Sequence, residues 1–246
     1  MSILRAENLT KIFSRRTVVK DMSLEVRSGE IIGLLGRNGA GKTTTFQMMI
    51  GLLRPDGGRI FLGETDISRM TTCERASLGI TYLPQEGSVF LKTSVENNLR
   101  MILEMQPLAK GEREERAREL LAELGLLALS KQGAHSLSGG ERRRLEIARA
   151  LVLNPKFLLL DEPFTGIDPL TILELQKIML HLKEREIGIV ISDHNVRDTF
   201  KVVSRACIID EGQKLVEGTP PIVASDASAR EKFLGKNFEL GEEIEP

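Results

Sequence analysis

Eight consecutive residues near the start of the chain have the composition and spacing of a phosphate-binding loop. They fit the pattern Gly-x-x-x-x-Gly-Lys-[Ser/Thr] and are Gly36, Arg37, Asn38, Gly39, Ala40, Gly41, Lys42 and Thr43. Glycines let such a loop wrap so that backbone N–H groups point at phosphate oxygens, and the helix that follows adds its positive end. We expect Lys42 to reach the β- and γ-phosphates of a nucleotide, and Thr43 to bind Mg²⁺ through its hydroxyl. Thr44 would extend the same cradle.

A second group able to do chemistry is a pair of carboxylates after an apolar run. Asp161 and Glu162 directly follow Leu158, Leu159 and Leu160. A carboxylate at the end of a buried strand can hold a hydrated Mg²⁺ beside a phosphate loop, which is the role expected for Asp161. Glu162 is then placed to orient or deprotonate the water that attacks the phosphate. The two patterns together predict a nucleotide triphosphate site.

Three further segments add polar groups to this site. Gln85 follows the expected strand 79–83, and His194 follows the apolar run 189–191. Open α/β sheets bind ligands just beyond their strand ends, so both side chains are candidate catalytic residues, and Gln85 is also a candidate Mg²⁺ ligand. The segment Leu137-Ser138-Gly139-Gly140-Glu141 opens a helix and offers a second set of backbone N–H groups to a phosphate.

The elements that must position these residues alternate between short apolar strands and longer helices, which favours an α/β fold with a parallel sheet. Strands are expected at 30–35, 79–83, 157–160, 187–191 and 206–209, and helices at 42–53, 112–124, 142–152 and 169–186. Asp168 is the expected N-cap of the last helix. The segment 87–152 is poor in strands and is expected to form an inserted helical subdomain. Residues 239–246 form an acidic tail.

Charge patterns on two helices give further expectations. Glu112 with Arg116, and Glu114 with Arg118, are spaced to pair at i,i+4 along one helix. The three consecutive arginines 142–144 favour a solvated helix face, with a contact to a partner protein as the less favoured interpretation.

The composition excludes several classes of protein. The 246 residues carry 34 Lys and Arg against 35 Asp and Glu, and this near-neutral balance argues against nucleic acid as a partner. The two cysteines, Cys73 and Cys207, are too far apart in the chain to indicate a zinc site, and no disulfide framework is expected. No run of 18 apolar residues and no signal-peptide pattern is present, so we expect a cytoplasmic chain without a membrane segment of its own.

The order of phosphate loop, Gln85, Leu-Ser-Gly-Gly-Glu, Leu-Leu-Leu-Asp-Glu, Asp168 and His194 resembles the nucleotide-binding subunits of ABC transporters, over residues 1 to about 235. The resemblance implies a P-loop NTPase core with a mostly parallel sheet, an N-terminal antiparallel β part and the helical subdomain, in one domain spanning 1–238. It also implies that the chain hydrolyses ATP with Mg²⁺ and forms a homodimer. Phe13 would stack on adenine, where the family more often has Tyr. Ser138, Gly139 and Gly140 would bind the γ-phosphate held by the opposing chain.

Within that family the chain most resembles the ATPases of lipopolysaccharide export in Gram-negative bacteria. The segments that carry this resemblance are 82–86, 137–144, 193–198 and 233–238. ATPases of branched-chain amino-acid importers remain the alternative, and a soluble ABC ATPase of iron–sulfur assembly is a further one. Both transporter interpretations imply integral membrane subunits, docked on the loop Gln85–Lys92 at the inner face of the inner membrane. Phe90 would be an apolar anchor there, unless it belongs to the core.

Overall fold

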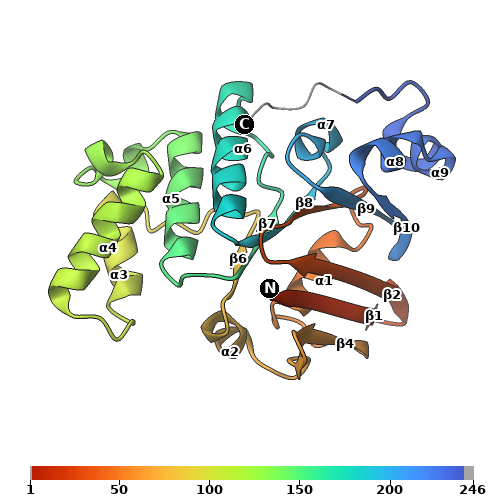
Figure 1. Cartoon of the computed structure of the whole chain (residues 1–246), viewed down its shortest axis with the longest axis horizontal. Coiled ribbons are helices and arrows are strands. Elements are labelled where there is room, and N and C mark those ends of the chain that lie inside the picture. Colours follow the sequence, from red (N-terminus) through yellow and green to blue (C-terminus); the bar gives the residue numbers. More distant parts are fainter. Residues whose placement is uncertain (1, 241–246) are drawn as a thin grey trace.

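The larger of two β-sheets has six strands in the order β10-β9-β3-β8-β7-β6, as seen in the computed structural model, which describes residues 2–240 (Figure 1). The strands β6, β7, β8, β3 and β9 run parallel, and β10 pairs antiparallel to β9 at one edge. Their bounds are β3 Ile31–Leu35, β6 Ile80–Leu83, β7 Phe157–Asp161, β8 Gly188–Asp193, β9 Arg205–Asp210 and β10 Gln213–Gly218. The expected parallel sheet is confirmed, with strand ends shifted by one or two residues.

The central strands are apolar along their whole length because both faces of the sheet are covered. Along β7, Leu158 and Leu160 pack with the helices, whereas Phe157 and Leu159 pack against α1 and the second sheet. Side chains of a strand alternate between its two faces, so a sheet buried on both sides needs apolar residues at every position. This explains why the sequence showed continuous apolar runs rather than an alternating pattern.

The second sheet is antiparallel, with the order β2-β1-β4-β5, and its strands are β1 Ile3–Phe13, β2 Arg16–Arg27, β4 Gly57–Leu62 and β5 Thr65–Asp66. Helix α1 (Lys42–Met49) is buried between the two sheets through Phe46, Met48 and Met49. The expected helix 42–53 is wrong at its end, because Gly51 has a φ of 82° and the chain turns there. The N-terminal antiparallel part of the expected fold class is confirmed.

A group of helices lies between β6 and β7 in the chain and occupies the left side of Figure 1. It contains α3 (Val95–Leu103), α4 (Lys110–Glu123), the 3-10 turns η1 (Leu127–Leu129) and η2 (Ala134–Ser136), and α5 (Gly139–Leu151). The exact domain bounds of 1–238 and 87–152 stay predictions. Of the acidic tail, only residues 239 and 240 fall within the described part of the chain.

The remaining helices after β7 pack against the large sheet in the same core cluster as α5. They are α6 (Pro169–Glu184), α7 (Val196–Phe200), α8 (Pro220–Ser225), α9 (Ala227–Ala229) and the π-helical turn η3 (Arg230–Leu234), and α2 (Thr72–Ser77) precedes β6. Of these helices, α8 and α9 lie beside the edge strand β10. The Asp168 side chain accepts a hydrogen bond from the N–H of Thr171, so the expected N-cap of α6 is confirmed.

The expected i,i+4 ion pairs of α4 do not form. The carboxylate of Glu112 instead accepts the backbone N–H of Ala109 and caps the helix, while Arg116 binds Glu119. Arg118 binds Glu115 at i,i+3. A carboxylate three residues from a helix start is used for capping first, because the exposed N–H groups there have no other partner.

A buried arginine fixes the C-terminal end of α1. The Arg75 side chain, whose residue is only 1% exposed, donates to the carbonyl oxygens of Met48 and Met49 at 2.7 Å and of Ser68 and Met70 at 3.1 Å. The last carbonyls of a helix lack partners within it, and a positive charge there is favourable. Burial lowers the pKa of Arg75 to about 10, so the guanidinium still carries its charge at neutral pH. Arg75 therefore joins α1 to α2 and to the β5–α2 connection.

We expect Arg75→Ala to lower the free energy of unfolding by about 3 kcal/mol, because buried carbonyl groups would lose charged donors. Urea unfolding at neutral pH measures this change. Arg69→Ala, which removes an exposed arginine from the same connection, is the matched control and should change stability by less than about 0.5 kcal/mol. Equal unfolding midpoints for the two variants would contradict this role of Arg75.

Candidate active site

The phosphate loop connects the end of β3 to the start of α1 and is shaped by two close approaches. A Cβ on Gly36 would lie 2.3 Å from the carbonyl oxygen of Ile209, and one on Gly41 would lie 2.9 Å from that of Val18. Gly41 also has a φ of 107°, which side chains rarely tolerate. These glycines let the loop turn tightly into α1, whose first N–H groups have no partner within the helix.

The lysine of the loop folds back over it. The Lys42 ammonium donates to the carbonyl oxygen of Gly36 at 2.8 Å and of Arg37 at 3.1 Å. Burial lowers the pKa of Lys42, and the charges of Glu162, Asp161 and Asp193 oppose this shift. The Lys42 ammonium is thus held close to the loop, where the carboxylates of Glu162, Asp161 and Asp193 attract it.

Asp161 ends β7 with both carboxylate oxygens engaged. It is 1% exposed; its Oδ2 accepts the hydroxyl of Tyr82 at 3.1 Å, and its Oδ1 accepts the hydroxyl of Ser192. The hydroxyl of Thr43 lies 3.4 Å from the same Oδ1. Thr43 and Asp161, the two residues expected to bind Mg²⁺, therefore lie next to each other.

Glu162 lies beside the two other candidate catalytic residues. Its Oε2 accepts the side-chain amide of Gln85 at 2.9 Å and the hydroxyl of Thr165 at 3.0 Å, and the Nδ1 of His194 is 3.6 Å away. Glu162 has a φ of 46°, in the left-handed region. Three strand ends that are distant in the sequence thus bring Gln85, Glu162 and His194 to one point.

Gln85 and Glu162, together with the phosphate loop, surround a hollow of about 290 Å³ that His194 does not line. Its lining residues are Val18, Asn38, Gly39, Gly41, Lys42, Thr43, Thr44, Gln85 and Glu162. A neighbouring hollow of about 490 Å³ shares the loop and is lined by Arg16, Thr17, Val18, Arg37, Asn38, Gly39, Ala40, Asp210 and Glu211. Phe13, at the end of β1, lines neither hollow; the residue is 42% exposed, and its backbone pairs in register with that of Arg16. Adenine stacking on Phe13 stays a prediction.

A buried carboxylate not singled out from the sequence fixes the backbone around this site. Asp193 accepts the N–H groups of His194 at 2.7 Å, of Asn195 at 2.8 Å and of Phe164 at 3.3 Å. Burial raises the pKa of Asp193 against the effect of these bonds. Asp193 therefore ties the segment carrying His194 to the turn after Glu162.

The segment 137–141 lies apart from the hollow. Ser138 caps α5: its hydroxyl accepts the N–H of Glu141 at 3.3 Å, and its own N–H donates to the Glu141 carboxylate at 2.8 Å. A Cβ on Gly140 would meet Thr171 at 2.5 Å, so Gly140 allows α5 to pack against α6. A Cβ on Gly139 would meet nothing within 4 Å. Ser138 and Gly139 are thus exposed at the start of α5 and do not line the hollow at this chain's own phosphate loop.

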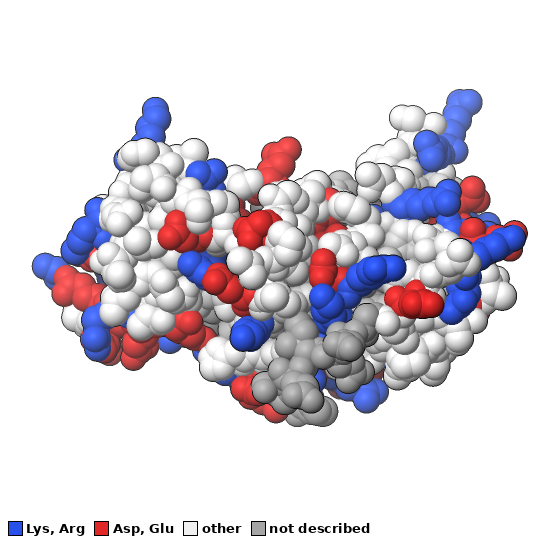
Figure 2. Space-filling view, turned by 90° about the horizontal axis from the view of Figure 1, so that it is seen from above, with Lys and Arg blue, Asp and Glu red and all other residues white. Residues whose placement is uncertain are grey.

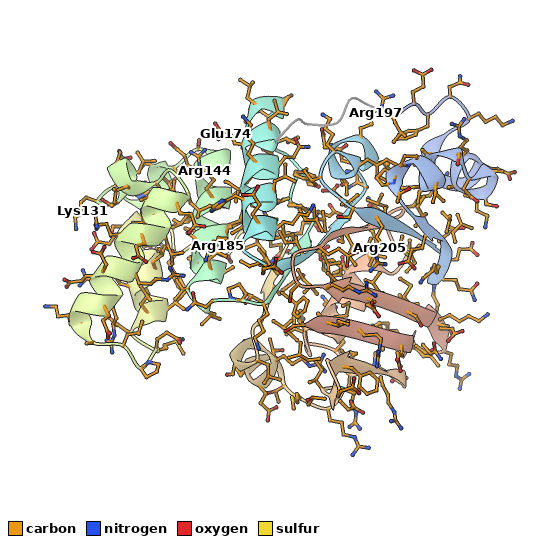
Figure 3. All side chains as sticks on the ribbon, in the orientation of Figure 1. Lys131, Arg144, Glu174, Arg185, Arg197 and Arg205 are labelled. Atoms are coloured by element: carbon orange, nitrogen blue, oxygen red, sulfur yellow. The ribbon has the colours of Figure 1, made fainter. Side chains whose placement is uncertain are left out.

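The expectation of a solvated arginine face is wrong for Arg143. It is 6% exposed and donates to the carbonyl oxygens of Pro84 at 3.1 Å and Asp161 at 3.3 Å, and to the Glu146 carboxylate at 2.8 Å. A buried arginine needs this set of acceptors, and Glu146 three residues later was the available signal. Arg144 forms an ion pair with Glu174 of α6 instead of pointing into water, as Figure 3 shows.

The loop after β6 is attached to α5 at several points. Glu146 accepts the N–H of Ser88 at 2.9 Å, and Arg149 donates to the carbonyl of the same residue. Asn98 binds the N–H and the carbonyl of Phe90 at 2.9 and 3.1 Å. The Phe90 ring is 46% exposed, with the Arg149 guanidinium 4.6 Å above it. Phe90 therefore lies at the surface and not in the core.

The oxygen donors of the site fit Mg²⁺. Residues 2–240 contain no cluster of three or more His, Cys, Asp or Glu side chains that could hold a metal alone. Mg²⁺ is commonly bound by one or two protein oxygens together with substrate phosphates, and the Asp161 carboxylate and the Thr43 hydroxyl provide such a pair. The site thus suits a metal that arrives with a nucleotide.

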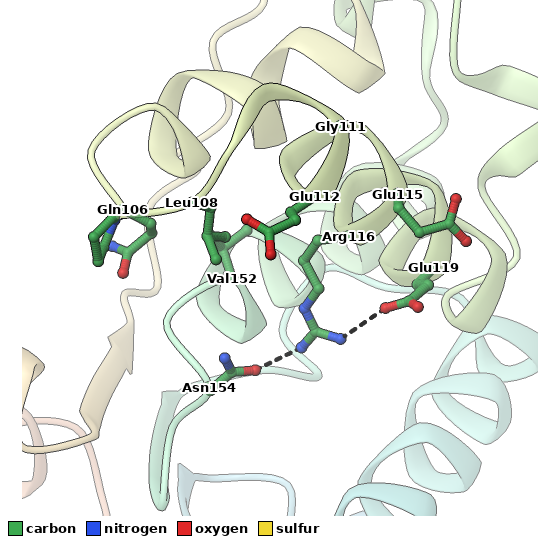
Figure 4. Close-up of a pocket in the computed structure, with 10 residues that line it drawn as sticks. Gln106, Leu108, Gly111, Glu112, Glu115, Arg116, Glu119, Val152 and Asn154 are labelled. Atoms are coloured by element: carbon green, nitrogen blue, oxygen red, sulfur yellow. Dashed lines mark hydrogen bonds and ion pairs between the residues drawn. The ribbon is translucent and has the colours of Figure 1, made fainter.

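A larger hollow, of about 640 Å³, lies on the helical segment away from the phosphate loop (Figure 4). Leu108 and Val152 line it, and Arg116 crosses it to reach Asn154 and Glu119. The carboxylates of Glu112, Glu115 and Glu119 all have partners within α4 or at its start. None of the residues that line this hollow also lines the hollow at the phosphate loop.

The surface carries both signs of charge. Figure 2 shows Lys and Arg side chains interspersed with Asp and Glu over the displayed face.

Among residues 2–240, none of the helices combines the length and apolar composition that crossing a bilayer requires.

Comparisons with known proteins agree with the geometry. Residues 19–165 match the family model described as ABC transporter. The lipopolysaccharide export system ATP-binding protein LptB of Acidithiobacillus ferridurans is 51% identical, over 97% of this chain and 99% of that protein. LptB of Escherichia coli K12 is 48% identical, over 98% and 100%. The solved structure of MJ1267, an ATP-binding cassette of an ABC transporter in its ADP conformation, superposes with a TM-score of 0.86 at 29% identity, over 96% of this chain and all of that one.

Proposed function

We propose a function for this chain on the basis of its family. The chain belongs to the ABC transporter family, and it is an ATP-binding subunit that hydrolyses ATP. The finer proposal is that this hydrolysis drives export of lipopolysaccharide from the inner membrane. It is supported by relatives that carry this function in their names and match at 48–51% identity over nearly the full chain. Export of this lipid is favoured over branched-chain amino-acid import and over iron–sulfur assembly for that reason.

In the proposed mechanism, the contact of Glu162 with both Gln85 and His194 is the observation that carries the assignment of the catalytic base. Glu162 accepts the proton of the attacking water, Gln85 orients that water, and His194 holds the Glu162 carboxylate in place. Lys42 and the N–H groups of residues 36–44 bind the phosphates. Thr43 and Asp161, with Gln85, would hold Mg²⁺, which neutralises phosphate charge when bound.

Glu162→Gln should bind ATP with unchanged affinity and hydrolyse it at least about 100-fold more slowly, because the amide accepts no proton from water. Phosphate release by the purified variant measures the rate, and a fluorescent ATP analogue measures binding. Glu186→Gln, in the turn after α6, is the control and should retain wild-type turnover. Turnover near wild type for Glu162→Gln would remove Glu162 as the base.

We further propose that two chains form each ATP site. One chain carries two separate places suited to a phosphate: the hollow at Lys42, and the exposed start of α5 at Ser138 and Gly139, which does not line that hollow. A second copy placed head to tail would bring its α5 N-terminus to the γ-phosphate. Bound ATP would then hold the dimer together, and hydrolysis would release it.

Glu162→Gln should therefore elute as a dimer in Mg-ATP and as a monomer without nucleotide, by size-exclusion chromatography. Adding Ser138→Arg should abolish the dimer without preventing ATP from binding to each single chain, because the arginine blocks the opposing surface but not the chain's own loop. Persistence of the dimer in this double variant would exclude the shared site.

The proposed docking surface for integral membrane subunits is the loop Gln85–Lys92. Support comes from the exposed ring of Phe90 and from the bonds of Arg143, Glu146 and Arg149 to this loop. The same loop contributes Gln85 to the ATP site. A partner pressed on Phe90 would thus move a segment that α5 holds on one side and Glu162 contacts on the other. This proposal puts the chain at the cytoplasmic face of the inner membrane.

Phe90→Ala should keep ATP hydrolysis in isolation but weaken membrane docking by about 1 kcal/mol or more, because about half of this side chain is still exposed and available to a partner. The measurement is growth of an Escherichia coli strain depleted of its own LptB. Expression of the wild-type chain should restore growth there, and expression of Phe90→Ala should not.

Two controls accompany this experiment. Leu52→Ala truncates another exposed apolar side chain, outside the loop, and should restore growth as the wild type does. A strain lacking the ATPase of its branched-chain amino-acid importer should gain no uptake from this chain. Restored uptake in that strain, with no growth in the depleted one, would replace lipid export by amino-acid import.

A further inference from the structure

The carboxylate of Asp161 is held by hydroxyl groups from the two strands that flank it. Ser192 of β8 pairs in register with Asp161 and donates to Oδ1. Tyr82 of β6 pairs in register with Leu159, two residues before Asp161 and therefore on the same face of the sheet. The long phenol side chain reaches forward over that distance and donates to Oδ2 at 3.1 Å.

These two bonds attach one carboxylate oxygen of Asp161 to β6 and the other to β8. Oδ2 accepts from Tyr82, and Oδ1 accepts from Ser192 and, at 3.4 Å, from the Thr43 hydroxyl. Rotation of the carboxylate would break at least one of the bonds to Tyr82 and Ser192, so these two bonds keep Oδ1 directed at Thr43. Within the described residues, no Lys, Arg or His side chain forms an ion pair with Asp161. Its orientation therefore depends on neutral hydroxyls, which hold the carboxylate without cancelling its charge.

The Tyr82 phenol is the donor in its bond to the Asp161 carboxylate. Burial and the charge of Asp161 both raise the pKa of Tyr82 above its ordinary value. Its neighbour Thr81 faces the other side of β6, is 9% exposed, and its hydroxyl has no hydrogen-bond partner among the described residues. The same strand thus offers one hydroxyl that is hydrogen-bonded to Asp161 and one that has no hydrogen-bond partner within the described residues.

We propose that Tyr82 is a positioning residue for the metal: together with Ser192, its hydroxyl aligns Asp161 so that Oδ1 and Thr43 can bind Mg²⁺ with the nucleotide. The inference rests on the proposed function, in which Asp161 is a metal ligand. It adds a residue that touches neither nucleotide nor metal but sets the affinity for the metal through the carboxylate. Loss of such an outer hydrogen bond commonly weakens metal binding by about 10–100-fold.

The test compares nucleotide affinity with and without the metal. A non-hydrolysable ATP analogue is titrated into the protein by calorimetry, once in Mg²⁺ and once in EDTA. For Tyr82→Phe, which keeps the ring, the affinity in EDTA should stay within about twofold of wild type, and the affinity in Mg²⁺ should fall by about tenfold. Ser192→Ala should change the Mg²⁺ value in the same direction. Thr81→Val, which removes the unpartnered hydroxyl, should match the wild type in both buffers.

The outcomes separate this inference from the assignment of the metal site. Asp161→Asn should lose the gain in affinity that Mg²⁺ gives. If it does, and Tyr82→Phe keeps that gain, the positioning role is overturned while the metal assignment survives. A Tyr82→Phe variant that loses affinity equally in both buffers would show a structural role only, which also overturns the inference. If Asp161→Asn keeps the gain, the metal assignment itself fails, and the inference fails with it.

A second measurement needs no substitution at Tyr82. The chain has one tyrosine and no tryptophan, so all tyrosine emission of the native protein comes from this residue. A phenol hydrogen-bonded to a carboxylate has quenched emission, and metal binding to that carboxylate alters the quenching. Excitation at the red edge of tyrosine absorption avoids the adenine. Emission should change when Mg²⁺ is added to the nucleotide-bound protein, and should not change in Asp161→Asn. Constant emission in the wild type would overturn the inference.

Discussion

Crowding three carboxylates and one ammonium at the edge of a sheet is the constraint on which the rest of this structure depends. Asp161, Glu162 and Asp193 all influence Lys42, and like charges this close are unfavourable unless each is satisfied separately. Each carboxylate has its own kind of donor: hydroxyls for Asp161, an amide and a hydroxyl for Glu162, and backbone N–H groups for Asp193. The strand order β3-β8-β7-β6 brings these donors together, because neighbouring parallel strands end at the same edge.

The same constraint determines which parts of the molecule are rigidly joined. Arg143 reaches from α5 to the carbonyl groups of Pro84 and Asp161, so one side chain touches the helical segment, the loop after β6 and the end of β7. Its charge is compensated by Glu146, which itself binds Ser88. Movement of α5 therefore cannot leave the loop with Gln85 unchanged.

Local patterns in the sequence were sufficient for the parallel sheet, the phosphate loop and the convergence of Gln85, Glu162 and His194. Glycine spacing, apolar runs and residues after strand ends are each encoded within a few positions. Tyr82 and Arg143 were not recognised as part of the site, because they lie within a strand and a helix and not directly after a strand end or in the phosphate loop. The pairs expected in α4 failed for the related reason that Glu112 had a competing partner at the helix start.

The left-handed backbone of Glu162 has an evolutionary consequence. A residue other than glycine in this region costs about 1–3 kcal/mol, a strain that glycine would relieve. Any selection for heat tolerance alone would accordingly favour losing the side chain proposed to activate water. Laboratory evolution of this chain therefore has to score turnover together with melting temperature, since the strained position and the reactive position are the same residue.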